Sequence, residues 1–262
     1  MSATRLLIDV GNTRLKWAFS DHQGLVPGET IMASPRLNKG LLKRYWGALE
    51  KPEAVILSSV AAPRVTAGVV EWLAQQWDLF PQQVQATQRQ CGVINGYHKP
   101  EQLGADRWAA LIAARQLFQG NLCVIDCGTA VTLDLLAKAG EHRGGLILPG
   151  LQMMHNALVR DTAGIQNGGV AQAEDGLMAR CTSAGIEAGT LYMLVAALDR
   201  IRADVTASLG SECRFVLTGG DAGRIAELIS FTAEVAPWLV LQGLDIMAGG
   251  QGNVLQGDAA VA

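Results

Sequence analysis

One type of segment occurs twice and constrains the fold more than any other feature. It is a short apolar run that leads into an aspartate, a glycine and a polar turn, first at Leu6–Thr13 (LLIDVGNT) and again at Cys123–Ala130 (CVIDCGTA). After each turn, apolar side chains occupy every second position, as in Leu15, Trp17 and Phe19. This alternation predicts two β-hairpins. Two hairpins of one kind, far apart in the chain, indicate two domains of similar construction.

The segments between and after the hairpins alternate between strand and helix patterns. Residues 55–60 predict a buried strand, and residues 214–218 predict another that ends in a glycine turn. Residues 109–118 and 190–201 carry apolar side chains at helical spacing. The repeated order of strands and helices predicts an α/β architecture. We place the boundary where the first of these helices ends on a glycine, which gives domains at residues 1–119 and 120–262.

Composition narrows the functional classes. Apolar residues make up 49% of the chain and charged residues 17%, which excludes a disordered protein. A net charge of −3 predicts neither a nucleic-acid partner nor an anionic membrane. No apolar run approaches the roughly 20 residues of a membrane span, and the N-terminus does not look like an export signal. The 5 cysteines are scattered without ligand spacing, which favours reduced thiols in the cytoplasm.

The glycine turns fit phosphate chemistry. A glycine after a strand lets backbone N–H groups approach a phosphate without obstruction by a Cβ atom. Asp9 could hold Mg²⁺, and Lys16 could neutralise phosphate charge. The alternative is an ordinary hairpin whose Asp and Asn side chains satisfy the turn, although the later Gly219-Gly220 turn favours the phosphate site. The turns match neither a Walker A motif nor the GxGxxG pattern of Rossmann folds.

A second charged motif is Tyr97–Arg107 (YHKPEQLGADR). Asp106 falls at the predicted start of a helix, where an aspartate is usually a cap. Arg107 opposes the helix dipole there, unless an anion binds to the guanidinium and to the free N–H groups. A substrate carboxylate beside a base at Asp106 would account for both charges. A salt bridge from Arg107 to another part of the chain is the competing explanation.

Taken together, these segments resemble the type III pantothenate kinase family. The resemblance rests on the first turn with Lys16, the Tyr97–Arg107 motif, and the second turn with Thr132 and Asp134 beyond it. It continues through Gly144–Gly150 (GGLILPG), Thr182 with Ile186 and Gly189, and Thr218-Gly219-Gly220, so it spans nearly the whole chain.

The resemblance implies two ribonuclease-H-like domains of the actin-like ATPase superfold and a homodimer. It implies transfer of the ATP γ-phosphoryl group to pantothenate, the first step of coenzyme A biosynthesis, with Asp106 as the general base. Pantothenate would contact Tyr97, Gly104, Ala105, Arg107 and Thr182, with Thr182 coming from the partner subunit. ATP would contact Asp9, Gly11, Asn12, Thr13, Lys16, Gly128, Thr129, Gly219 and Gly220. Asp9 would hold Mg²⁺, and Asp126 would lie near a monovalent cation, K⁺ or NH₄⁺.

Two alternatives stay open at this stage. The first is another small-molecule kinase or an ATPase of the same superfold, against which the Tyr97–Arg107 motif argues. The second is a regulatory accessory factor of transcription that has no catalytic activity. The net charge and the lack of a helix-turn-helix signature argue against direct DNA binding.

Overall fold

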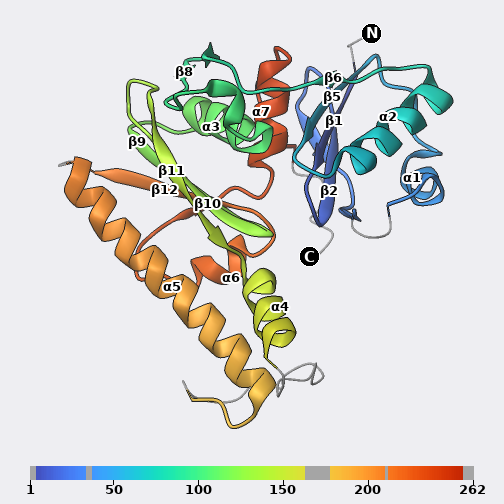
Figure 1. The fold of residues 1–262 in the computed structure, drawn as a ribbon. Helices are drawn as coiled ribbons and strands as arrows, with labels where there is room; N and C mark the ends of the chain where they lie inside the picture. Colours follow the sequence, from blue (N-terminus) through green and yellow to red (C-terminus); the bar gives the residue numbers. More distant parts are fainter. Residues whose placement is uncertain (1–3, 34–36, 163–177, 210–211, 256–262) are drawn as a thin grey trace. The chain divides into compact units, whose positions relative to one another are not determined.

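The computed structural model describes residues 4–33, 37–162, 178–209 and 212–255. The described residues form two compact units (Figure 1). The first unit is built from residues 1–122, 134–144 and 238–262, and the second from residues 123–133 and 145–237. The two predicted actin-like domains, divided after residue 119, remain a prediction.

The first unit contains a mixed sheet with the strand order β3-β2-β1-β5-β6, in which β4 also pairs with β2. Its strands are β1 (Arg5–Val10), β2 (Arg14–Ser20), β3 (Leu25–Pro27), β4 (Ile31–Met32), β5 (Ala54–Ser59) and β6 (Gln82–Gln83). Strands β1 and β2 are antiparallel, which confirms the first predicted hairpin, and Asp9 lies opposite Lys16. Strand β5 runs parallel to β1, and its Ser58 lies on the other side of Asp9.

Helices cover both faces of this sheet (Figure 1). On one face, Leu6, Ile8 and Val10 join a core with Trp46 of α1 (Lys39–Trp46) and Trp72 of α2 (Pro63–Trp77). The helices α3 (Ala105–Leu117) and α7 (Leu239–Met247) lie on the other face. Because side chains alternate along a strand, Asp9 points to the face opposite that core, where α3 and α7 lie.

Close packing of α3 against α7 depends on a glycine. A Cβ atom added to Gly243 of α7 would lie 2.0 Å from the carbonyl oxygen of Ala109 in α3. Short elements complete the approach to α3: β7 (Arg89–Gln90), β8 (Val93–Ile94) and the 3₁₀ turn η1 (Pro100–Gln102).

A buried carboxylate fixes the segment that follows α7 to the first two strands. Asp245 accepts a hydrogen bond from the N–H of Gly252 at 2.9 Å and another from the hydroxyl of Ser20. Arg5 of β1 lies 3.6 Å from the same carboxylate. Asp245 therefore has a structural role and sits among polar partners of its own.

The second sheet has the order β11-β10-β9-β12-β13. Its strands are β9 (Asn121–Cys127), β10 (Ala130–Leu136), β11 (His142–Pro149), β12 (Cys213–Thr218) and β13 (Glu234–Val235). The helices of the second unit are α4 (Leu151–Asp161), α5 (Thr182–Leu209) and α6 (Ala222–Ala226). The second predicted hairpin and the predicted strand at 214–218 are thus confirmed. The division between the units crosses β9, β10 and β11, so Asp134 and His142 belong to the first unit. Among the described residues, the structure contains no helix long and apolar enough to cross a membrane.

Candidate active site

The start of α3 carries a carboxylate that does not serve as the N-cap. The N-cap residue is Gly104, which has no side chain to bond the first turn. Asp106 is the second residue of the helix, and its Oδ1 accepts a hydrogen bond from the N–H of Arg107 at 2.7 Å. A Cβ atom on Gly104 would lie 2.6 Å from that oxygen, so only glycine leaves the carboxylate its place.

The environment of Asp106 favours a proton acceptor. Burial raises the pKa of its carboxyl, while the N–H and the positive charge of Arg107 lower it and the negative charge of Asp134 raises it; the net direction is upward. A carboxylate with a raised pKa is a stronger base near neutral pH than an ordinary aspartate. Asp106 is only partly buried.

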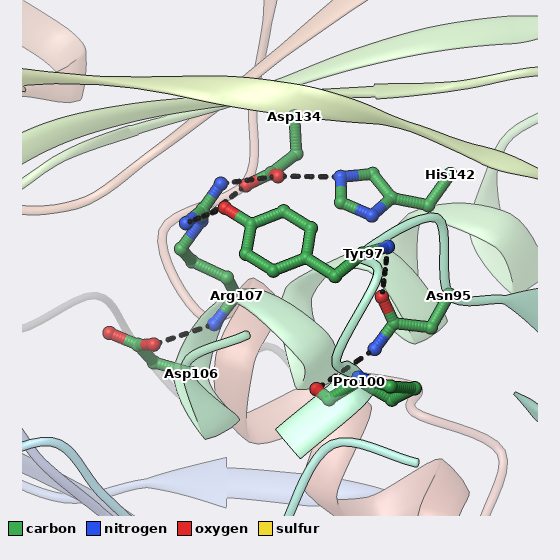
Figure 2. Close-up of polar contacts among 7 residues, drawn as sticks. All are labelled: Asn95, Tyr97, Pro100, Asp106, Arg107, Asp134 and His142. Carbon is green, nitrogen blue, oxygen red and sulfur yellow. Dashed lines mark hydrogen bonds and ion pairs between the residues drawn. The ribbon is translucent and has the colours of Figure 1, made fainter. Parts of the chain in front are cut away.

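Arg107 forms the salt bridge that the sequence left open as an alternative. Its Nε donates to Oδ2 of Asp134 at 2.8 Å, and its Nη2 donates to Oδ1 at 2.7 Å (Figure 2). The side chains are only 8% and 3% exposed, so this is a buried, bidentate pair. Burial lowers the pKa of Arg107, but the bonds to Asp134 and Tyr97 outweigh it, and the guanidinium stays charged.

Tyr97 and His142 complete a cluster around this pair. The Nη1 of Arg107 donates to the hydroxyl of Tyr97 at 2.9 Å, and the guanidinium lies 5.6 Å from the centre of the tyrosine ring. The ring of His142 stacks on Tyr97 with 5.6 Å between centroids, and its Nε2 lies 2.8 Å from Oδ1 of Asp134 (Figure 2). We call Tyr97, Arg107, Asp134 and His142 the Arg107 cluster.

A buried asparagine holds the loop that carries Tyr97. The N–H of Tyr97 donates to Oδ1 of Asn95 at 3.0 Å, and Nδ2 of Asn95 donates to the carbonyl of Pro100 at 3.2 Å. Asn95 and His142 were missed by the sequence analysis, and Asp134 entered it only as part of a motif. The one signal for Asp134 was Arg107 itself, because a cation at a helix start requires a counter-ion.

The first glycine turn lies in the same unit as Asp106. The N–H of Gly11 donates to the carbonyl of Arg14 at 3.0 Å, and the carbonyl of Thr13 accepts from Ala33 at 2.8 Å. The ammonium group of Lys16 lies 5.8 Å from the ring centre of Trp238. Asn12 is exposed at the tip of the turn.

Val60 connects this turn with the start of α3. Its N–H donates to the carbonyl of Val10 at 3.1 Å. Its Cγ1 would lie 3.6 Å from a Cβ atom on Gly104. The structure therefore brings the turn after Asp9 and the helix start that carries Asp106 to the same part of the first unit.

The remaining glycine turns meet in the second unit. The N–H of Gly150 donates to the carbonyl of Thr129 at 3.1 Å, and the N–H of Asp221 donates to the carbonyl of Cys127 at 3.0 Å. Gly219 has a φ of +96°, and a Cβ atom there would lie 2.5 Å from Oδ1 of Asp126. The structure thus brings Gly219 beside the turn that contains Gly128 and Thr129. Gly220 is exposed next to it.

Charge gathers beside the second turn. Burial, together with the negative charges of Asp126 and Asp221, raises the pKa of the Cys127 thiol, which therefore stays protonated.

Thr182 is the exposed first residue of α5, also in the second unit, whereas Ala105 is the partly buried first residue of α3. Within the described residues, no three His, Cys, Asp or Glu side chains group as a metal site.

Sequence relatives identify the family. The family model for type III pantothenate kinases matches residues 5–204. The chain belongs to the type III pantothenate kinase family. A type III pantothenate kinase of Nitrosococcus oceani is 41% identical over 244 residues, covering 91% of each chain. One of Burkholderia vietnamiensis is 37% identical over 260 residues, covering 95% of this chain and 97% of the relative.

Solved structures define the fold of this family member. A putative 2-dehydro-3-deoxygalactonokinase of Sinorhizobium meliloti aligns with a TM-score of 0.56 at 14% identity, covering 98% of both chains. A conserved putative Baf family transcriptional activator of Campylobacter jejuni aligns with a TM-score of 0.56 at 18% identity, covering 93% of this chain and 97% of that one. The fold is α/β and belongs to the actin-like ATPase and sugar kinase superfold, as the sequence predicted.

Proposed function

We propose that the protein transfers the γ-phosphoryl group of ATP to the primary hydroxyl of pantothenate, giving 4'-phosphopantothenate and ADP in the first step of coenzyme A biosynthesis. The observation that carries the proposal is the start of α3, where the partly buried Asp106 has a raised pKa and lies beside the paired Arg107. Membership of the type III pantothenate kinase family supports the choice of substrate.

Asp106 acts as the general base in this proposal. Its carboxylate takes the proton of the substrate hydroxyl as that oxygen bonds to the γ-phosphorus of ATP and the bond to the β-phosphate oxygen breaks. Because the transition state of phosphoryl transfer is loose, positioning and charge neutralisation contribute most. The missing side chain at Gly104 supports this role, since it leaves the carboxylate of Asp106 uncovered by its own helix.

The acid end of pantothenate is assigned to the Arg107 cluster. Three of the five N–H groups of the guanidinium are bonded to Asp134 and Tyr97, which leaves two for a carboxylate. The backbone at Gly104 and Ala105 borders Asp106 and completes this side of the proposed site. Thr182 is proposed to reach pantothenate from the partner subunit.

The nucleotide is assigned to the glycine turns. In the first unit these residues are Gly11, Asn12, Thr13 and Lys16, and in the second Gly128, Thr129, Gly219 and Gly220. A Cβ atom at Gly150 or Gly219 would collide with the backbone of the second turn, so the glycines there allow these segments to pack closely against the turn that contains Gly128 and Thr129. The carboxylate of Asp9 and the ammonium group of Lys16, on paired strands, fit a magnesium phosphate by charge.

Two cations belong to the proposal. Asp9 would hold Mg²⁺, which when bound neutralises phosphate charge, with waters and phosphate oxygens as the other ligands. Asp126 would lie near a monovalent cation, K⁺ or NH₄⁺. The carboxylates of Asp126 and Asp221, which both raise the pKa of Cys127, support a cationic partner at the second turn.

A homodimer is part of the same proposal. Large apolar side chains are exposed on neighbouring elements of the second unit: Leu146 and Ile147 on β11, Met153 and Leu158 on α4, and Tyr192 and Met193 on α5. Large exposed apolar side chains on one part of a chain favour a protein contact site, and a second copy is a common partner. We also propose a cytoplasmic enzyme with no nucleic-acid or membrane partner; the 5 free cysteines support a reducing compartment.

The test is ADP release by the purified protein with ATP, Mg²⁺ and K⁺, with and without pantothenate. We expect release that depends on pantothenate, and Asp106→Asn should lower kcat by about 10²–10⁴-fold without loss of ATP binding. Glu101→Gln changes an exposed carboxylate of the nearby turn η1 and is expected to behave as wild type.

The same assay separates the alternatives. Turnover with a different acceptor in a substrate panel would replace pantothenate and keep the kinase. Absence of turnover with every acceptor and monovalent cation would favour a regulatory protein. Near-normal turnover of Asp106→Asn would remove the base from the proposal.

A further inference from the structure

Two members of the Arg107 cluster are not assigned to any substrate. We propose that Asp134 and His142 are positioning residues for the acid substrate, and that they act through Arg107 and Tyr97. Asp134 orients the guanidinium, and His142 orients both the carboxylate of Asp134 and the ring of Tyr97. The inference rests on the proposed function, because it concerns how that site holds the carboxylate of pantothenate.

Asp134 determines which edge of the guanidinium remains available. A guanidinium can pair with a carboxylate through two parallel N–H groups, and Arg107 uses its Nε and Nη2 in this way. Its Nη1 is held by Tyr97. One N–H group on Nη1 and one on Nη2 are then left unused. These two N–H groups are the ones that remain for a second carboxylate.

His142 acts one step further from the substrate. A carboxylate only accepts hydrogen bonds, so the Nε2 that lies 2.8 Å from Asp134 carries the proton. The opposite nitrogen, Nδ1, is buried without a hydrogen-bond partner in the described part of the chain. The single polar bond of the ring therefore goes to Asp134, and its flat face stacks on Tyr97.

A purely stabilising role explains this arrangement less well. Buried ion pairs contribute little net stability compared with well-packed apolar side chains of similar volume. Here a buried pair is joined by a histidine and a tyrosine at the first turn of the helix that carries Asp106. Asp134 and Tyr97 bond the guanidinium directly, and His142 contacts both of them, which is the arrangement expected where the direction of a charged group matters.

Two effects of Asp134 on the substrate have opposite signs. Its negative charge repels a bound carboxylate, whereas its hydrogen bonds hold Arg107 in place to receive one. Without Asp134, the guanidinium can turn toward Asp106, the adjacent residue in the helix, whose pKa its charge already lowers. We expect the orientation of Arg107 to outweigh the charge repulsion. A guanidinium turned toward Asp106 would no longer bind the substrate carboxylate, and it would pair with the general base.

The experiment measures KM for pantothenate and for ATP in Asp134→Asn, His142→Phe and His142→Gln. His142→Phe keeps the ring stacked on Tyr97 but loses the donor, whereas His142→Gln can place an amide N–H near the position of Nε2. We expect KM for pantothenate to rise about 10-fold in Asp134→Asn and about 3-fold in His142→Phe, as for a hydrogen bond to a charged group that acts indirectly. His142→Gln should restore part of the loss, and KM for ATP should not change.

A neutral N-alkyl amide of pantothenate separates positioning from general damage. It lacks the carboxylate, so its inhibition constant should be nearly the same in wild type and Asp134→Asn. The matched control is Asp245→Asn, which alters an equally buried carboxylate of the same unit with its own arginine partner. Asp245→Asn is expected to lower the melting temperature without changing KM for pantothenate.

Several outcomes would overturn the inference. One is an unchanged or lower KM for pantothenate in Asp134→Asn, and another is an equal loss of affinity for pantothenate and for the neutral amide. If Asp134→Asn does not fold, the two His142 variants decide. A KM for pantothenate that is the same in His142→Phe and His142→Gln would then count against the inference. Failure of the proposed function looks different, because wild type itself would then release no ADP with pantothenate.

Discussion

The Arg107 cluster of the first unit and the glycine turns of the second are built on opposite principles. In the cluster, charged and aromatic side chains from a loop, a helix and two strands meet around one buried guanidinium. In the turns, backbone atoms meet because side chains are missing: Gly150 lies against the carbonyl of Thr129, and Gly219 lies against Asp126 and the carbonyl of Cys127.

This difference predicts which substitutions each region tolerates. A side-chain cluster should survive substitutions that keep its hydrogen bonds and charge, and it should fail when one charge loses its partner. A backbone turn should fail when a Cβ atom is added at a glycine that already lies against other backbone atoms, as Gly150 and Gly219 do. The comparison is also chemical, since the cluster is assigned to pantothenate and the turns to ATP.

The largest expected effect comes from Arg107→Ala. The substitution leaves Asp134 buried without its bidentate partner, and removing one side of a buried pair costs about 3–5 kcal/mol of unfolding free energy. Urea denaturation measures this loss. Arg200→Ala, which breaks an exposed i,i+4 pair with Asp204, is the control and should show no measurable loss. The folded fraction of Arg107→Ala should still bind ATP in calorimetry. A loss of ATP affinity would contradict the assignment of the cluster to pantothenate and of the turns to ATP.

Gly219→Ala should weaken ATP binding, which Arg107→Ala is expected to leave intact. The residue has a φ of +96°, and the new Cβ atom would lie 2.5 Å from both Asp126 and the backbone of Cys127. Strain at such a position costs about 1–3 kcal/mol, and relief of the clash should displace the turn and weaken ATP binding by about 10-fold or more. The control is Gly185→Ala in α5, where, among the described residues, no atom beyond its chain neighbours and the backbone of its own helix lies within 4 Å of the added Cβ. Unchanged ATP affinity in Gly219→Ala would remove the turn from the nucleotide site.

The two regions also differ in how far the sequence predicts them. Hairpins and glycine turns are local, so alternation around Leu6–Thr13 and Cys123–Ala130 was enough to place them. The start of α3 was equally local, and the unfavourable position of Arg107 in its first turn predicted an anionic partner. The identity of that anion was not local, because Asp134 and His142 come from strands whose pairing the sequence does not give. The neutral N-cap at Gly104 was not predicted either, since aspartate is the commoner cap.

The smallest expected effect is a shift in a pH profile, and it links the cluster to the base. Burial raises the pKa of Asp106, Arg107 lowers it, and the charge of Asp134 raises it again. Asp134→Asn removes the last of these and leaves the charge of Arg107 uncompensated, so the pKa of Asp106 should fall. A general base works only when deprotonated, so activity appears as the pH rises through that pKa, and the acid limb of kcat/KM should move to lower pH. Asp245→Asn should leave the limb in place. A limb that moves to higher pH in Asp134→Asn would mean that Asp134 does not act on the base through its charge, and the cluster would then serve substrate binding alone.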